Sequence, residues 1–161
     1  MQLIDKKDPI LNNKCEPFDF ANPPFDPVEF AEHLIKFMYE KNGLGLSANQ
    51  VGIPYRIFCM RGSPKNFVCY NPKIVDSSDE EVVLEEGCLS FPNLLVKIKR
   101  PRHIRVRFQY PNGETVTEKF TGMTARVFQH ELDHMDGEIF YKKANKFHRD
   151  RALKKWKYGG V

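Results

Sequence analysis

The chain has 161 residues, of which 41% are apolar and 29% are charged, and its formal net charge is +4. These values are typical of a soluble globular protein, and the length suits one compact domain spanning residues 1–161. No apolar run approaches the roughly 20 residues that cross a bilayer, and charges occupy the start of the chain where a signal peptide would be apolar. We therefore expect a cytoplasmic protein with no membrane partner.

The first strong pattern predicts a helix that begins near Asp26. Asp26 suits the N-cap, Pro27 suits the first helical position, and Glu29 completes a capping box. Apolar residues then recur at helical spacing as far as Met38, and Asn42-Gly43 ends the run.

Residues 43–52 are predicted to form a loop, because they contain several glycines and small residues. Such a loop lets the main chain approach a bound peptide, and the side-chain amide of Gln50 could donate a hydrogen bond to a developing oxyanion. Glycine-rich turns are common, so this segment alone defines no site.

Segments rich in β-branched and aromatic residues predict strands in the middle of the chain, the last two forming a hairpin. They span residues 55–60, 67–70, 81–84, 94–98, 103–110 and 114–120. Helices are predicted over residues 122–135 and, with many basic side chains, over 147–157. Together these elements predict an α+β fold with mainly antiparallel strands packed around one central helix, the one over residues 122–135.

That central helix carries a His-Glu-x-x-His pattern. His130 and His134 are four residues apart, so both imidazoles lie on one helical face and can reach one metal ion. Glu131 is placed where it can take a proton from water at such an ion. Asp133 is expected either to orient a ligand histidine or to be an ordinary exposed acid. The pattern is short and also occurs by chance.

A third ligand has to come from another part of the chain. A metzincin has a further histidine where this chain has Phe140, and no later glutamate is placed as in thermolysin-like enzymes. Cys88 is the outstanding upstream candidate, because a thiolate is a strong ligand for divalent transition metals. Gly87 before it lets the backbone come close to a substrate. A buried structural cysteine is the alternative for this segment taken alone.

Three segments in this order resemble the motifs of peptide deformylases: Gly43 to Gln50, Glu86 to Ser90, and Gln129 to His134 with its following Gly137. The resemblance extends from about Pro9 to Phe140. It implies a metal-dependent hydrolase that removes the N-formyl group from the N-terminal methionine of newly made polypeptides, releasing formate. Its substrates are N-formylmethionyl nascent peptides, so the role is N-terminal processing in protein biosynthesis.

The same resemblance assigns roles to individual residues. It implies that Cys88, His130 and His134 bind one divalent metal with water in the fourth position, and that Glu131 is the general base. The side-chain amide of Gln50 and the backbone N–H of Leu89 would stabilise the oxyanion. Coordination chemistry alone favours zinc, whereas the resemblance points to Fe²⁺ in the cell, with Zn²⁺ or Ni²⁺ as substitutes.

Substrate contacts follow from the resemblance too. Gly45 and Gly87 would pair with the peptide backbone as neighbouring strands do, and Val127 and Phe128 would help line the methionine pocket. Ser47 stands where alanine is usual in the family pattern.

Lysine and arginine are dense between Lys142 and Lys157. This block is either the solvated face of a terminal helix or a footprint for nucleic acid, and it resembles the segment by which some deformylases contact the ribosome.

Two other functions stay open. A metallopeptidase would cleave other amide bonds, including those of unformylated peptides, and a metal-stabilised binding domain would need a fourth protein ligand.

Overall fold

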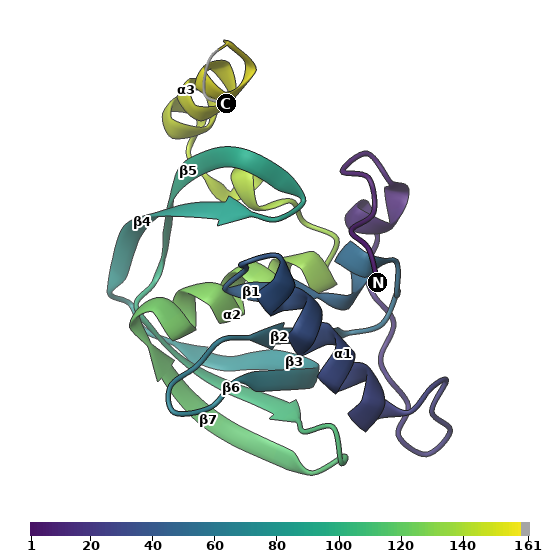
Figure 1. The fold of residues 1–161 in the computed structure, drawn as a ribbon. Helices are drawn as coiled ribbons and strands as arrows, with labels where there is room; N and C mark the ends of the chain where they lie inside the picture. Colours follow the sequence, from purple (N-terminus) through teal and green to yellow (C-terminus); the bar gives the residue numbers. More distant parts are fainter. Residues whose placement is uncertain (159–161) are drawn as a thin grey trace.

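The structure, a computed structural model, describes residues 1–158 (Figure 1). Its helices are α1 (Pro27–Glu40), α2 (Gly122–Met135) and α3 (Lys146–Tyr158), with 3-10 turns η1 (Pro9–Asn12), η2 (Ala48–Val51) and η3 (Phe140–Lys143). Its strands are β1 (Gly45–Ser47), β2 (Ile57–Met60), β3 (Phe67–Ser77), β4 (Glu81–Cys88), β5 (Phe91–Pro101), β6 (His103–Gln109) and β7 (Thr115–Thr121).

The strands form two sheets. Five of them pair in the order β1-β2-β3-β6-β7, and β4 pairs with β5 in a separate two-stranded sheet. All these named pairings are antiparallel. The predicted α+β class with mainly antiparallel strands is confirmed. Within residues 1–158, no helix is long and apolar enough to cross a membrane.

Helix α1 begins where the sequence predicts. The Asp26 side chain accepts hydrogen bonds from the backbone N–H groups of Val28 and Glu29, which caps the helix. Its inward face buries Leu34 and Met38 completely in a core shared with β2. The chain leaves the helix at Asn42, whose positive φ of 57° ends the helical run as predicted.

Several strands are longer than predicted, and one predicted loop is wrong. β3 continues to Ser77, β4 continues to Cys88, and β5 extends in both directions. Within the predicted loop over residues 43–52, Gly45–Ser47 pair with β2, and the chain then turns through η2. Backbone hydrogen bonding to β2 therefore overrides the weak strand propensity of this glycine-containing segment.

Helix α2 lies between the two sheets (Figure 1). On one side it contacts β1, β2, β6 and β7 of the five-stranded sheet. On the other, the Arg126 guanidinium donates hydrogen bonds to the backbone carbonyls of Val82 in β4 and Ile98 in β5. Gly137 follows the helix at a φ of 73°, where a Cβ would lie 2.7 Å from the carbonyl carbon of Asn13. The helix end is thereby fixed by a position that only glycine fills without strain.

Helix α3 is attached to the two-stranded sheet. It contacts β5, and Leu153 and Trp156 pack against the buried cluster that contains Leu94 and Val96. The Trp156 indole N–H donates a hydrogen bond of 2.8 Å to the carbonyl of Pro92 in β5. These contacts hold one face of a highly basic helix against the rest of the molecule.

Candidate metal centre and substrate cavity

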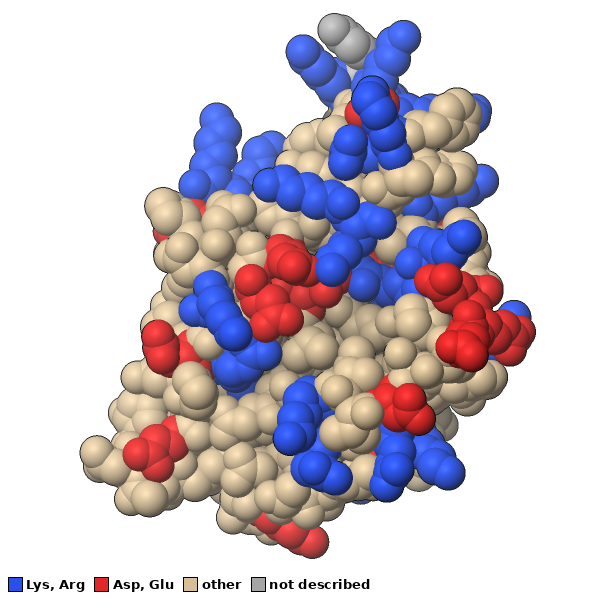
Figure 2. All heavy atoms as spheres, turned by 180° about the vertical axis from the view of Figure 1, so that it is seen from behind, with Lys and Arg blue, Asp and Glu red and all other residues tan. Residues whose placement is uncertain are grey.

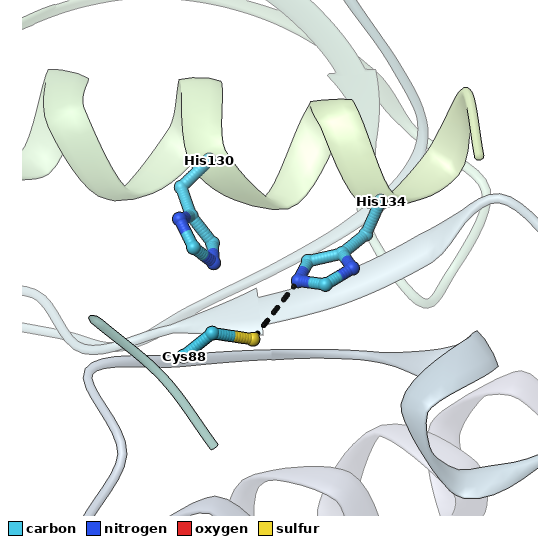
Figure 3. Close-up of side chains that lie close together, drawn as sticks. All are labelled: Cys88, His130 and His134. Atoms are coloured by element: carbon cyan, nitrogen blue, oxygen red, sulfur yellow. Dashed lines mark hydrogen bonds between the residues drawn. The ribbon is translucent and has the colours of Figure 1, made fainter. Parts of the chain in front are cut away.

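One group of metal-ligating side chains forms where α2 faces the end of β4. The imidazoles of His130 and His134 point from the helix toward Cys88, the last residue of β4 (Figure 3). One nitrogen from each histidine and the Cys88 sulfur all lie within 4.8 Å of one another. The Cys88 Sγ is 3.4 Å from His134 Nε2. The family resemblance implies that these three side chains lie close together, and the structure brings them together.

Glu86 orients the first histidine. Its Oε1 lies 3.0 Å from His130 Nδ1, so the other ring nitrogen faces Cys88. Burial opposes the charged imidazolium, but hydrogen bonds with Cys88 and Glu86 raise the pKa of His130 to about 10. Sequence reasoning quoted Glu86 only as part of the Glu-Gly-Cys segment and gave it no role. The sequence offered one indication of such a role, the position of Glu86 two residues before the candidate ligand Cys88.

Glu86 also sits in a buried charge cluster with two arginines. Its Oε2 accepts hydrogen bonds from Arg100 Nε at 2.6 Å and from Arg126 Nη1 at 2.7 Å. Glu86, Arg100 and Arg126 are each at most 6% exposed. Burial alone would raise the pKa of Glu86, but the hydrogen bonds from His130 and Arg100 hold it at about 2. The carboxylate therefore stays charged beneath the metal centre.

Asp133 is linked to the candidate metal site through Arg100 rather than by a direct contact. Its carboxylate accepts a 2.8 Å hydrogen bond from Arg100 Nη1 and lies 3.7 Å from Lys143 Nζ. It is thus neither a direct partner of a ligand histidine nor a freely solvated helix acid. Asp133 positions Arg100, which binds Glu86, which in turn orients His130.

Glu131 is a buried carboxylate with an unused oxygen. It is 3% exposed, and its Oε2 has no hydrogen-bond partner among the residues that the structure describes. Burial is the largest cause that raises the pKa of Glu131, to about 7, although the neighbouring His130 lowers it. A carboxylate with a pKa near neutrality can both accept and return a proton, as a general base must.

The Gln50 side chain is held with its amide group toward Cys88. Its Oε1 accepts a hydrogen bond from the Ser47 N–H at 3.0 Å and lies 2.9 Å from the Ser47 hydroxyl. Its Nε2 donates to Ser90 Oγ at 2.9 Å and lies 3.5 Å from Cys88 Sγ. The Ser47 backbone N–H and the Ser90 hydroxyl thus fix the orientation of the Gln50 amide.

A cavity of about 600 Å³ opens onto these groups. Among the residues that line it are Gly45, Gln50, Gly87, Cys88, Leu89, Val127, His130 and Glu131. Phe128 does not line it. That ring is fully buried and packs edge-on against Phe58, with a centroid distance of 5.0 Å. Since neighbours on a helix point about 100° apart, α2 directs Val127 into the cavity and Phe128 into the core.

Gly45 lies where α2 approaches β1 closely. A Cβ at this position would lie 2.8 Å from Val127 Cγ1 and 3.0 Å from Glu131 Oε1. We expect Gly45→Ala to displace the Glu131 carboxylate and to lower kcat/KM of the reaction at this site by about tenfold to a hundredfold, since small misplacements of reacting groups are costly. Steady-state kinetics test this. Gly113→Ala, in the β6–β7 turn, is a control that changes stability without changing kcat/KM.

The donor set fits a divalent metal. Tetrahedral ligation by two nitrogens and one sulfur places the ligand atoms roughly 3.4–3.6 Å apart, so small side-chain shifts suffice from the observed spread of at most 4.8 Å. Burial lowers the pKa of His134 well below its usual value, which keeps that imidazole neutral as a ligand requires. Glu131 lines the adjoining cavity, and its buried Oε2, which has no hydrogen-bond partner among the described residues, suits a polar group bound there.

A catalytic metal site keeps one coordination position for water or substrate. Among the described residues the candidate group supplies three protein ligands, and a cavity opens on it. Fold and site therefore have the arrangement expected of a hydrolase that uses one metal ion.

Comparison with known proteins narrows this class. The profile of the family described as polypeptide deformylase matches residues 1–150. The peptide deformylase of Thermotoga neapolitana is 42% identical over 134 residues, covering 82% of this chain and 79% of that protein. The one from Bartonella tribocorum is 34% identical over 162 residues, covering 96% and 90%. The chain belongs to the peptide deformylase family.

Solved structures agree with this membership. A crystal structure of peptide deformylase from Plasmodium falciparum superposes with a TM-score of 0.88 at 30% identity, covering 97% of this chain and 93% of that one. Peptide deformylase from Thermotoga maritima gives a TM-score of 0.83 at 36% identity, covering 89% and 97%.

Proposed function

We propose that this chain removes the N-formyl group from the N-terminal methionine of newly made polypeptides and releases formate. The observation that carries this function is the meeting of Cys88, His130 and His134 beside the buried Glu131, with Cys88, His130 and Glu131 lining an open cavity. Membership of the deformylase family supports it. No feature of the site favours a peptidase that cleaves other amide bonds, the alternative that the sequence left open.

Cys88, His130 and His134 would hold the metal, and α2 would thus be the central helix that carries a metal-binding His-Glu-x-x-His motif. A divalent metal held there would lower the pKa of water and polarise the formyl carbonyl. Glu131 would receive the proton that the attacking water loses as its oxygen bonds to the formyl carbon. When the C–N bond breaks, the same carboxyl group returns a proton to the leaving amine, so that formate and a free N-terminus result.

Two hydrogen-bond donors would stabilise the oxyanion of the tetrahedral intermediate. The Gln50 amide is directed toward Cys88 by its contacts with Ser47, and Leu89 follows Cys88 directly in the turn that leads to β5. Both residues line the cavity. Donors that are already oriented before the reaction lower its barrier without reorganisation, which is the usual source of oxyanion stabilisation.

The substrate backbone has two sheet edges to pair with. Within the described residues, β1 pairs only with β2 and β4 only with β5 as named strands, so each has a second edge without a strand. Both strands contribute a residue to the cavity lining, Gly45 of β1 and Gly87 of β4. An extended peptide would add a strand between them, and main-chain hydrogen bonds would bind it with little selection of side chains. Val127 would line the methionine pocket.

For the native metal we propose Fe²⁺, with Zn²⁺ or Ni²⁺ able to substitute. The Cys-His-His donor set suits zinc by coordination chemistry alone, and the support for iron is the family resemblance.

We further propose that residues 1–161 act as one domain, that the protein works in the cytoplasm, and that the segment from Lys142 to Lys157 contacts the ribosome. The last proposal is supported by lysine and arginine side chains that gather around α3 at one end of the molecule (Figure 2).

Metal analysis tests the ligand set directly. We expect Cys88→Ala to bind almost no metal after dialysis, whereas the wild type retains about one equivalent, because a site with one ligand removed holds its ion far more weakly. Cys15→Ala is the matched control, since Cys15 is also a free cysteine but is buried in the main core. If Cys88→Ala keeps a full equivalent of metal, Cys88 is not a ligand.

A further inference from the structure

A second cavity lies between the β4–β5 sheet and α3. Its volume is about 390 Å³, and we call it the basic cleft. Lys97 of β5 lines it on one side, and Arg151 and Lys155 of α3 line it on the other, with His148 beside them. Glu85 is the one carboxylate in its lining. Three full positive charges against one negative charge give the cleft a positive potential, which its concave shape concentrates.

The basic cleft continues from the substrate cavity. Glu85 and Asn93 line both cavities. Pro92, which lines the substrate cavity, accepts the hydrogen bond from Trp156, which lines the basic cleft. A molecule that leaves the substrate cavity past Glu85 and Asn93 therefore enters the basic cleft.

Strand geometry relates the cleft to positions in a substrate. In the proposed function the reacting formyl group would lie at Cys88, and Glu85 is three residues back along β4, a distance of roughly 10 Å at about 3.3 Å per residue. A peptide paired antiparallel to β4 with its formyl end at Cys88 runs toward Glu85. Its third to fifth residues then lie at the entrance of the basic cleft.

We propose that the basic cleft is a substrate subsite that takes an acidic side chain at the third to fifth position of a formyl-Met polypeptide. This inference rests on the proposed deformylase function and adds a preference for charge to a backbone-reading site. Continuity with the substrate cavity favours a peptide over an RNA phosphate as the occupant. Lys97, Arg151 and Lys155 are exposed, so their effect is screened by salt and each contributes modestly.

Competition between peptides tests the proposal. Formyl-Met-Ala-Ala-Xaa-Ala peptides with glutamate, glutamine or lysine at the fourth position would be deformylated by the metal-loaded wild type at low and high salt. We expect kcat/KM to favour glutamate over lysine by about threefold to tenfold at low salt, with glutamine between them, because exposed ion pairs are individually weak. The preference should fall as ionic strength rises.

Charge variants locate the effect. K97Q and K155Q should each reduce the preference for glutamate, and R151Q combined with K155Q should abolish it. K154Q is the matched control, since Lys154 is an exposed neighbour on the same helix that does not line the cleft, and it should keep the preference.

Formyl-Met-Ala, too short to reach the cleft, separates the two proposals. If it is deformylated but the longer peptides show no charge preference, the subsite is absent while the deformylase function stands. If K155Q instead weakens binding of an RNA hairpin without changing peptide preference, the cleft binds nucleic acid and the proposal is overturned. Loss of formate release from every peptide would contradict the function itself.

Discussion

Glu131→Gln is expected to lower kcat for formate release by about 10²–10⁴-fold, the usual contribution of a general acid–base group. Glutamine preserves the shape of the buried side chain but cannot accept and return a proton at the reacting centre. The variant should bind as much metal as the wild type, because Glu131 is not among the three grouped ligands. Formate release and metal content, measured on the same preparation, test both statements.

Glu138→Gln is the control for that change. Glu138 is an exposed acid just beyond α2 that pairs with Lys143 at 2.7 Å, outside the substrate cavity. Its substitution should leave kcat within about twofold, as expected for a surface position. If metal-loaded Glu131→Gln retained more than about a tenth of the wild-type rate, an effect far below that of a general base, proton transfer would have to be assigned to another group.

Glu86→Gln is expected to cost about 3–5 kcal/mol in the free energy of unfolding, the usual cost of removing one partner from a buried ion pair. The change leaves Arg126 buried without a carboxylate and leaves Arg100 with Asp133 alone. Since a domain of this size is stable by about 5–15 kcal/mol, the loss is a large fraction of the total. The midpoint of urea unfolding should fall while the slope of the transition is unchanged.

Glu85→Gln provides the comparison for stability. Glu85 is adjacent in sequence but points to the opposite face of β4, where it is exposed. Its loss should change the unfolding free energy by no more than about 0.5 kcal/mol. Equal unfolding midpoints for the two variants would mean that the Glu86 carboxylate does not compensate the buried arginines.

The sequence is most informative about elements with strong local signals. Asp26 and Pro27 mark the start of α1, and the helical spacing of apolar residues marks the face it buries. The motif on α2 is equally local, because the four-residue separation of His130 and His134 is enough to place both on one face. The upstream position of Cys88 emerged by exclusion of later ligands together with the family resemblance.

Strand ends were harder to predict, because they depend on distant partners. The predicted strand over residues 67–70 stops before Asn71 and Pro72, yet β3 continues through both residues with a register shift against β6. Asn71 adopts a positive φ of 52°, and its side chain bonds both the N–H and the carbonyl of Phe18. A contact across 53 residues thus stabilises a conformation that local propensity disfavours.

The buried charge cluster next to the candidate metal site was not predicted, for the same reason. Glu86, Arg100 and Arg126 are separated by 14 and 26 residues, and no periodic pattern links them. The pairing of β4 with β5 brings Glu86 and Arg100 together, and the packing of this sheet against α2 adds Arg126. Phe128 shows a different limit: the family resemblance assigned it with Val127 to the methionine pocket, whereas the rotation of the helix directs its ring into the core.

Formate release is the most direct measurement. The protein would be purified without oxygen, loaded with Fe²⁺ or Zn²⁺, and given formyl-Met-Ala-Ser beside acetyl-Met-Ala-Ser and unblocked Met-Ala-Ser. We predict formate and a free amine in equal amounts from the first peptide, with no cleavage of the other two. Cleavage of internal amide bonds in the unblocked peptide, or no formate from protein that carries a full equivalent of metal, would contradict the proposed function.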